Sequence, residues 1–205
     1  MKSSHCFKKA KVNRVLVLCQ VFCFMIVLAH AQKQSGEIVN GKKDGEWKYY
    51  FADGKVSAIE HFKNGVLDGP VEYFYPDGSR QGKENWRDGI MEDSSTYWHK
   101  NGLVDKKGKY EKGQYAGEWR HYYENGKLKR IVNYVDGLPE GPMKAFNENG
   151  SLYQEGYYLK GKEDGEWKFY SSDGELEFTG KYKDGKEDGT WYVYKKGKQK
   201  VYKRD

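Results

Sequence analysis

The sequence predicts an all-β fold, an elongated and twisted antiparallel meander of about seven β-hairpin repeats of 24 residues each. Three observations lead to this prediction. The segment GKKDGEWKYY at residues 41–50 returns as GKEDGEWKFY at residues 161–170, glycine recurs in a 24-residue register, and aromatic residues keep the same spacing. A fixed period between about 20 and 50 residues is the signature of a repeat architecture.

The glycine register runs without an insertion from Gly41 to Gly189. Steps of 24 residues from the anchor Gly45 reach six further anchor positions, of which only Asp93 is not glycine. Two more series of glycines follow nine and twenty residues after the anchors, beginning with Gly54 and Gly65. We expect no helix in these repeats, because no window escapes glycine for long enough to sustain a period of about 3.6 residues.

Each repeat is predicted to be one hairpin that turns at its mid-repeat glycine. Asx-Gly between aromatic-rich runs is a strong hairpin signal, because both residues tolerate the positive φ angles of a two-residue type I′ turn. In the first repeat we expect strands at about 46–51 and 56–62, with a Gly-x-x-x-Gly connector such as 41–45 leading into each hairpin. The residues before the mid-repeat glycines are Asp53, Asp77, Asn101, Asn125, Asn149 and Asp173.

Aromatic residues occupy two positions in every repeat, five and seventeen residues after the anchor, as Tyr50 and Phe62 do in the first repeat. Strand alternation places Trp47 and Tyr49 on one face of the sheet and Tyr50 on the other. The sheet is therefore expected to carry aromatic side chains on both faces. A further row, two residues after the anchor, contains Trp47, Trp119, Trp167 and Trp191.

Residues 1–31 are predicted to be a secretory signal peptide, and residues 32–205 to be the repeat domain. Residues 1–14 carry five basic residues and no acid, residues 15–31 carry no charge, and the segment ends in Ala29-His30-Ala31. An uncleaved membrane anchor is the alternative, because 17 apolar residues are just long enough to span a bilayer. We expect an exported protein, in the periplasm, on the cell surface or outside the cell, that meets the membrane only during export.

The predicted signal peptide distorts the composition of the whole chain. The sequence has 36 Lys and Arg against 30 Asp and Glu, but five of the basic residues lie in residues 1–31, so the repeat domain is almost neutral. We therefore expect no nucleic-acid partner, because phosphate binding needs a clustered basic surface. All three cysteines also lie in residues 1–31, which excludes cysteine catalysis and thiolate metal sites from the repeat domain.

The unit G-x-x-x-G-x-W-x-x-Y-x-x-D/N-G, followed by a second aromatic residue and a glycine, resembles the MORN (membrane occupation and recognition nexus) repeat. It looks most like the bacterial variant found in antitoxin-like proteins. GEWKYYFADGK, GEWRHYYENGK and GEWKFYSSDGE carry the resemblance best, which covers about residues 36–202. Val71, Ser95 and Met143 replace the tryptophan, and Asp93 replaces an anchor glycine. The resemblance implies an elongated array of hairpins with a non-catalytic, interaction-type role.

The candidate binding residues are Trp47, Tyr49, Trp119, Trp167 and Trp191. We expect most of the aromatic rings to form the core of a thin sheet. If one row is exposed, the tryptophan row is the best candidate, because it varies between repeats whereas the other two aromatic positions do not. Such a row suits a protein partner or the sugar rings of a glycan. The predicted function is a protein-interaction or scaffolding module, with a carbohydrate- or cell-wall-binding module as the alternative.

We expect no enzymatic activity, no cofactor and no metal site. No nucleophile motif, metalloprotease helix or phosphate loop is present. Three histidines, His61, His99 and His121, sit at different repeat positions, which is a weak pattern for zinc. Acidic residues before the anchor glycines suit turn geometry, with a calcium site as the alternative. They include Asp44, Asp68, Asp164 and Asp188.

Two segments depart from the consensus. In the third repeat, Asp93, Ser95 and Trp98 break the pattern while the register holds; this repeat is either a local contact site or tolerated drift, and we expect drift. Lysines crowd the last hairpin between Lys195 and Lys200. They form either a basic docking tail or, as we expect, a charged edge that prevents strand-to-strand aggregation.

Overall fold

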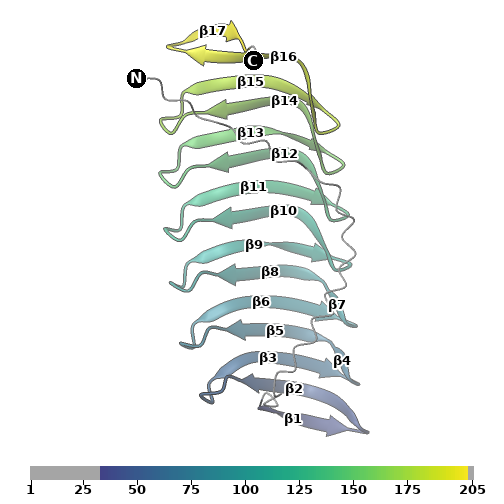
Figure 1. Ribbon diagram of the computed structural model, residues 1–205. Coiled ribbons are helices and arrows are strands. Elements are labelled where there is room, and N and C mark those ends of the chain that lie inside the picture. The colour runs from purple at the N-terminus through teal and green to yellow at the C-terminus, as the bar shows by residue number, and fades with distance from the viewer. Residues whose placement is uncertain (1–32, 203–205) are drawn as a thin grey trace, which may run out of the picture. The chain divides into compact units, whose positions relative to one another are not determined.

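The computed structural model describes residues 33–202, and these residues form one antiparallel sheet of 17 strands without a helix (Figure 1). The all-β prediction is confirmed. The predicted signal peptide at residues 1–31 lies outside the described residues. Within residues 33–202, no helix is long and apolar enough to cross a membrane.

The strands follow one another through the sheet in chain order, and all paired strands are antiparallel. They are β1 (Gln34–Val39), β2 (Lys42–Tyr50), β3 (Val56–Lys63), β4 (Val66–Leu67), β5 (Gly69–Phe74), β6 (Arg80–Arg87), β7 (Ile90–Met91), β8 (Asp93–Trp98), β9 (Val104–Glu111), β10 (Gln114–Tyr122), β11 (Leu128–Val135), β12 (Leu138–Phe146), β13 (Leu152–Leu159), β14 (Lys162–Tyr170), β15 (Leu176–Lys183), β16 (Lys186–Lys195) and β17 (Lys198–Val201).

Two of the strands are interrupted by one residue. The short β4 and the following β5 both pair with β3, and they occupy together the place that a single strand holds elsewhere. The short β7 and the following β8 pair with β6 in the same way. Asp68 and Glu92, at the two interruptions, still donate backbone hydrogen bonds of 2.9 Å to the neighbouring strand. The meander of seven hairpins is therefore confirmed, and it is preceded by β1.

The mid-repeat turns differ from the prediction. In the first repeat, Phe51 N–H donates to the Lys55 carbonyl (2.8 Å), and Gly54 N–H donates to the Phe51 carbonyl (3.0 Å). Gly54 has a positive φ angle, whereas Asp53 does not. This is a three-residue loop in which a type I turn is followed by one left-handed glycine. The predicted two-residue type I′ turn is therefore wrong at this place.

Two-residue turns occur at the other end of the strands. Asn40 and Gly41 both have positive φ angles, of 51° and 75°, and they join the paired residues Val39 and Lys42. The predicted connector between hairpins is thus a type I′ turn followed directly by strand, so β2 begins at Lys42 and not near residue 46. The last hairpin uses such a turn as well, at Lys196-Gly197, which shortens that loop by one residue.

The anchor glycine lies in an irregularity of the pairing. Gly45 has a φ angle of 66°, in the left-handed region that favours glycine. Asp93 stands at the same position with a φ angle of 63°, which aspartate tolerates better than most residues. The backbone conformation of the anchor is therefore kept in the third repeat, where the glycine is lost.

A glycine lies beneath each tryptophan of the row. On β1, Gly36 alone faces three residues of β2, the last of which is Trp47. A Cβ atom on that glycine would lie 2.4 Å from the indole ring, and on the equivalent glycines the distance is 2.1–2.3 Å. Any larger residue would therefore displace the ring. The other pairs are Gly108 with Trp119, Gly156 with Trp167, and Gly180 with Trp191.

Where the tryptophan is absent, the glycine is absent too. Met143 lies opposite Val132, which stands at the position of the glycine. In the two repeats where Ser95 and Val71 replace the tryptophan, a glutamate stands at the position of the glycine. Each of the three departures from the repeat consensus therefore changes two positions at once. A smaller residue replaces the tryptophan, and a larger residue replaces the glycine on the neighbouring strand.

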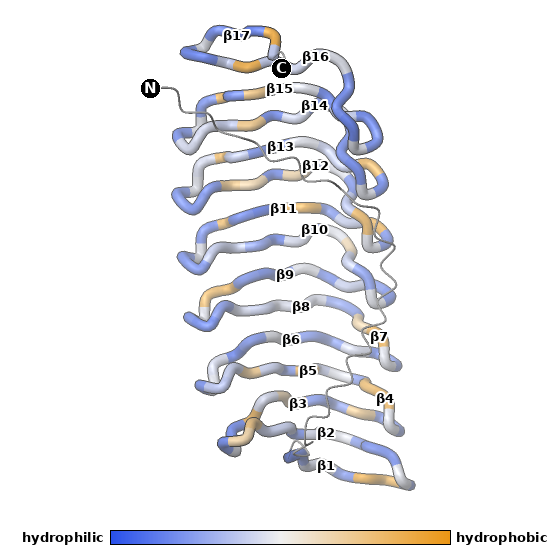
Figure 2. Tube along the Cα trace, in the orientation of Figure 1, coloured by the Kyte–Doolittle hydropathy of each residue, from blue (hydrophilic) through white to orange (hydrophobic). Residues whose placement is uncertain are grey.

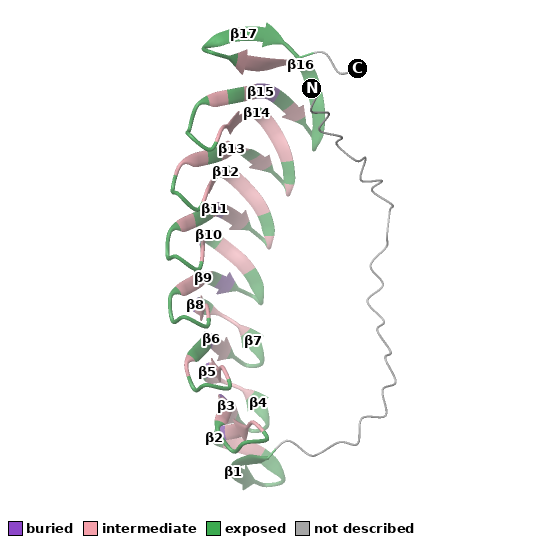
Figure 3. Cartoon of the chain, turned by 60° about the vertical axis from the view of Figure 1, so that its left-hand side comes forward, coloured by how far each residue is buried: buried purple, intermediate pink, exposed green. Residues whose placement is uncertain are grey.

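The buried core is a single layer on one face of the sheet. We call the face that carries Trp47 face A and the opposite one face B. Trp119 and Trp167 are almost completely buried, and Val132 and Met143 pack against Trp167. Exposed residues gather in the turns at both ends of the strands and on β1 and β17, which are exposed throughout, while the middles of most other strands are buried or half-buried (Figure 3). Apart from the two-residue strands β4 and β7, no strand is apolar along its whole length (Figure 2).

We predict that Gly156→Ala lowers the free energy of unfolding by about 1–3 kcal/mol, because the new methyl group forces the Trp167 ring out of place. Adding Trp167→Met should recover part of this loss, since Met143 already lies opposite a valine. Urea unfolding of the two single variants and the double variant measures both effects. A Gly156→Ala protein as stable as the parent would contradict the role of this contact.

Candidate functional site

The predicted binding row of tryptophans is mostly core. Trp47, Trp119 and Trp167 are 6%, 0% and 1% exposed, so these three rings belong to the core, where most of the aromatic rings were expected. The reason is that each indole lies flat over a glycine of the preceding strand. Tyr49 and Trp191 are half-buried. As the sheet stands, the three buried rings offer no free face to a ligand.

The second hairpin contains a buried acid, Glu84 on β6, that accepts hydrogen bonds from aromatic donors. Glu84 is 7% exposed, and its carboxylate accepts hydrogen bonds from the Tyr97 hydroxyl (2.6 Å), the Trp86 indole N–H (3.0 Å) and the Tyr73 hydroxyl (3.4 Å). Burial and this carboxylate hold the pKa of both tyrosines well above the usual range. Ser95 beside it is 2% exposed, and its Oγ has no partner among the described residues. Glu84 thus fills space that an indole takes in other repeats.

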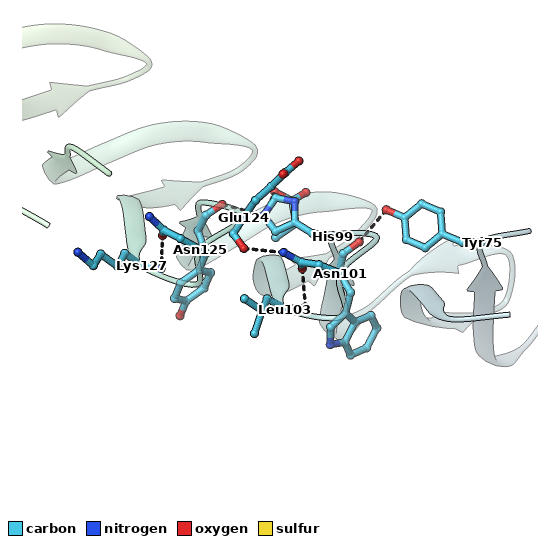
Figure 4. A network of polar contacts seen from close by, with 10 residues as sticks. Tyr75, His99, Asn101, Leu103, Glu124, Asn125 and Lys127 are labelled. Carbon is cyan, nitrogen blue, oxygen red and sulfur yellow. Dashed lines mark hydrogen bonds and ion pairs between the residues drawn. The ribbon is translucent and has the colours of Figure 1, made fainter. Parts of the chain in front are cut away.

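The mid-repeat turns are tied to one another by side chains (Figure 4). The Tyr75 hydroxyl donates to the Trp98 carbonyl (2.8 Å), and the Asn101 side chain donates to the Glu124 carbonyl (2.6 Å). His99 Nε2 lies 3.1 Å from the Tyr122 carbonyl. Each contact joins residues 23 apart, and therefore one repeat to the next. His99 has a structural partner here.

The acids before the anchor glycines have a structural role. The Asp44 carboxylate accepts a hydrogen bond of 2.9 Å from the backbone N–H of Asn64, the first residue of the next type I′ turn. Glu92 and Glu140 accept the equivalent bonds from Lys112 and Lys160 (3.0 and 2.6 Å). These turn residues have positive φ angles, so the acids stabilise strained backbone. Within residues 33–202, no group of three His, Cys, Asp or Glu is placed to hold a metal.

One row of face A contains neighbouring basic side chains. Lys106 lies directly opposite His121, and His121 lies directly opposite Arg130, on β9, β10 and β11. We call these three residues the basic segment. Burial, followed by the charges of Arg130 and Lys106, lowers the pKa of His121 to about 4. This histidine is therefore neutral at pH 7.

Face B carries exposed apolar side chains near the type I′ turns. Val135 and Leu138 face each other across β11 and β12 and are 57% and 51% exposed, and Tyr157 and Leu159 on β13 are also exposed. We call these four residues the apolar patch. Two shallow depressions on the same face, of about 260 and 200 Å³, have equivalent linings 48 residues apart. The second depression reaches Tyr157, and so adjoins the apolar patch.

Sequence reasoning did not find these two surfaces. The signal for the apolar patch was present, because the other repeats often have a charged residue at these positions. Lys63 and Lys183 stand where Leu159 does, and Lys42, Lys162 and Lys186 stand where Leu138 does. The basic segment had no such signal, because its members are joined only by the register of three strands.

The MORN repeat variant family matches residues 43–64, 67–88, 115–136, 139–160 and 163–184. The matches keep the 24-residue step and pass over the third repeat, where Asp93 and Ser95 depart from the consensus. No curated protein matches the chain.

Among solved structures, one match is titled "Crystal structure of GtfA/B complex bound to UDP and GlcNAc". It is 11% identical with a TM-score of 0.27, and the match covers 62% of this chain and 24% of that chain. The chain thus spans about a quarter of that chain's length. A likeness of this size carries no argument about function.

We predict that Ser95→Trp destabilises the protein by about 1–3 kcal/mol, because Glu84 occupies the place of the glycine that an indole needs. Glu84→Gly alone should also destabilise, because three donors lose their acceptor. Together the two changes should cost less than the sum of the single changes, which a double-mutant cycle in urea measures. Additive costs would show that the pairing rule does not hold here.

We predict that His121 lowers the stability of the fold in mild acid. Its folded pKa of about 4 lies below the ordinary value near 6.5. The unfolded chain therefore binds the proton first as the pH falls from about 6.5 to about 4, and stability is lost over that window. The loss should be roughly 1–2 kcal/mol, allowing for the partial exposure of the ring. His121→Gln should lose less stability over this window in urea unfolding at several pH values, and an unchanged profile would contradict the assignment.

Proposed function

The chain belongs to the MORN repeat variant family, and we propose that it acts as a protein-interaction module that holds a protein partner on face B of its sheet. MORN repeats form a family of non-catalytic interaction modules. The finer proposal is a scaffolding role, and its partner is a protein that presents an apolar surface. The observation that supports it is the apolar patch of Val135, Leu138, Tyr157 and Leu159.

The apolar patch brings exposed apolar side chains together on three successive strands. The buried apolar side chains form the single layer of face A, whereas these four side chains lie on face B and are 38–57% exposed. Contiguous exposed apolar side chains with a polar rim are typical of interaction sites. Here the adjoining depression supplies that rim, with Lys144, Glu155, Glu166 and Lys168 in its lining.

The same edge of the sheet carries two further exposed apolar side chains toward the N-terminus. Val66 and Ile90, at the positions equivalent to Leu138 in earlier repeats, are 45% and 47% exposed. The side chain of each lies beside the glycine of the following turn, as Leu138 does beside Gly161. A partner that begins on the apolar patch therefore has further apolar contacts along the turns of β4 and β7.

The glycan alternative has no such support. It rested on an exposed row of indole rings, and three of the four indoles are buried. The half-buried Tyr49 and Trp191 belong to the first and the last hairpin, so they do not form a continuous row. We do not propose carbohydrate binding.

We predict that a photo-crosslinking residue at Leu138 captures a specific protein partner in the native host, and that one at Lys42 does not. Lys42 is the matched control, because it occupies the same repeat position four repeats earlier. The variant Val135→Lys/Leu138→Lys/Leu159→Lys, with the crosslinker at Tyr157, should lose the captured band. It should stay folded, because other repeats carry lysine or arginine at these positions. A band that persists in this variant, or appears equally at Lys42, would contradict the proposal.

Export is part of the proposal and rests on residues 1–31 alone. Their basic start, uncharged run and Ala29-His30-Ala31 ending support cleavage after Ala31. N-terminal sequencing of the protein from its host tests this. A chain that begins at Gln32 supports export with cleavage, and a chain that keeps residues 1–31 in the cytoplasm contradicts it.

A further inference from the structure

A single row of side chains crosses face A from β1 to β17. Its members are successive cross-strand partners, and directly opposite residues of antiparallel strands share a face. The row contains no carboxylate. It runs Gln34, Tyr49, Ala58, Tyr73, Gly82, Tyr97, Lys106, His121, Arg130, Ala145, Gln154, Phe169, Phe178, Val193 and Lys200.

The basic segment stands in the middle of this row. Lys106, His121 and Arg130 follow one another on three adjacent strands, whose spacing is about 4.8 Å. Their neighbours in the row are the neutral Tyr97 and Ala145. A packed row of a thin sheet does not need such a group, because it brings positive charges together without an acid beside them in the row.

The two permanently charged residues of the basic segment, Lys106 and Arg130, differ in their surroundings. Lys106 Nζ donates to the Tyr115 hydroxyl (3.1 Å) and lies 4.5 Å from the centre of the Tyr97 ring, so its position is fixed by aromatic neighbours. Arg130 is exposed. Neither makes an ion pair within 4.0 Å with an acid of residues 33–202. The guanidinium of Arg130 therefore has donors for a ligand, and Lys106 adds a charge on β9, two strands away.

The histidine between them lacks a partner. His121 Nε2 is buried and makes no hydrogen bond with the described residues, and the ring lies 6.5 Å from that of Trp119. The charged groups that act on it are Arg130, Lys106 and Lys129, which oppose its protonation, and Asp105, which favours it. Asp105 also lies 3.5 Å from His99 Nε2. The surroundings of His121 are thus short of negative charge.

We propose that the basic segment is a binding site for a doubly charged oxyanion of the sulfate type, contacted by Arg130 and Lys106. The planar guanidinium matches two oxygens of a tetrahedral anion, and the ammonium group adds a point charge. A dianion fits because it balances both fixed charges and favours a third on His121. The site lies on face A, opposite the apolar patch, so it does not depend on the protein-binding proposal.

We predict that sulfate binds saturably to the folded full chain at pH 6.5, measured by NMR at constant ionic strength with chloride as the balancing ion. The largest shifts should be at Lys106, His121 and Arg130. Sulfate is the probe because its charge is constant between pH 4 and 8. Saturating sulfate should also raise the pKa of His121 by at least one unit, which is a tenfold gain in proton affinity.

Matched variants decide whether the site is specific. Arg130→Gln should weaken sulfate binding at least fivefold, whereas Lys144→Gln should leave it within twofold. Lys144 is the control because it removes the same charge from the adjacent strand, on face B, where it lies opposite Ile131. Equal losses in the two variants, or shifts that rise linearly with sulfate and do not saturate, would overturn the proposal.

Methyl sulfate tests the charge of the anion, because it carries one negative charge where sulfate carries two. Tighter binding of sulfate than of methyl sulfate would support a site for the free dianion, whereas equal binding of the two ions would overturn the proposal, because the site would then not select the second charge. An unchanged pKa of His121 in saturating sulfate would overturn it, because an anion over the basic segment acts on that ring.

Discussion

The structure depends on the contact between an indole ring and a glycine of the preceding strand. A sheet of one layer has no second layer to pack against, so its core must lie flat along its own surface. Each tryptophan of the row meets this need by covering a glycine. Because dispersion contacts are lost over even a small gap, the ring needs backbone beneath it, and a side chain there displaces it. One glycine faces three residues of the next strand, and this irregular pairing places the ring over the glycine backbone. It occurs at Gly36, Gly108, Gly156 and Gly180.

This contact explains which positions of the repeat vary and how. The tryptophan row changes only together with the facing position, as Met143 with Val132 and Ser95 with Glu84 show. Both ends of the strands are held by contacts of another kind. Acids such as Asp44 stabilise the backbone of the next type I′ turn, and residues such as Asn101 join neighbouring mid-repeat turns. The 24-residue period is therefore enforced in the core and at both edges of the sheet.

The hairpins, their number and the two-sided placement of aromatic residues were predictable from spacing alone, because the period leaves few alternatives. The turn types were not, since Asp53-Gly54 suits both a two-residue and a three-residue loop, and the flanking hydrogen bonds decide between them. Most aromatic rings were expected in the core, and Trp119 and Trp167 lie there. Variation between repeats made the tryptophan row the candidate for exposure, but this variation reflects the size of the residue on the facing strand.

The apolar patch and the basic segment differ in how far they depend on the pairing register of the strands. This difference explains why the sequence indicates the first surface but not the second. The apolar patch changes single positions that are charged in other repeats, so a comparison of repeats finds it. The basic segment joins residues 15 and 9 apart, and only the pairing of β9, β10 and β11 makes them neighbours. A core residue on face A is replaced only together with the residue that packs against it from the next strand. A residue near a turn on face B is replaced without a change at another position. Aromatic neighbours hold Lys106 on the restricted face, and the proposed anion would account for the His121 and Arg130 that follow it in the row.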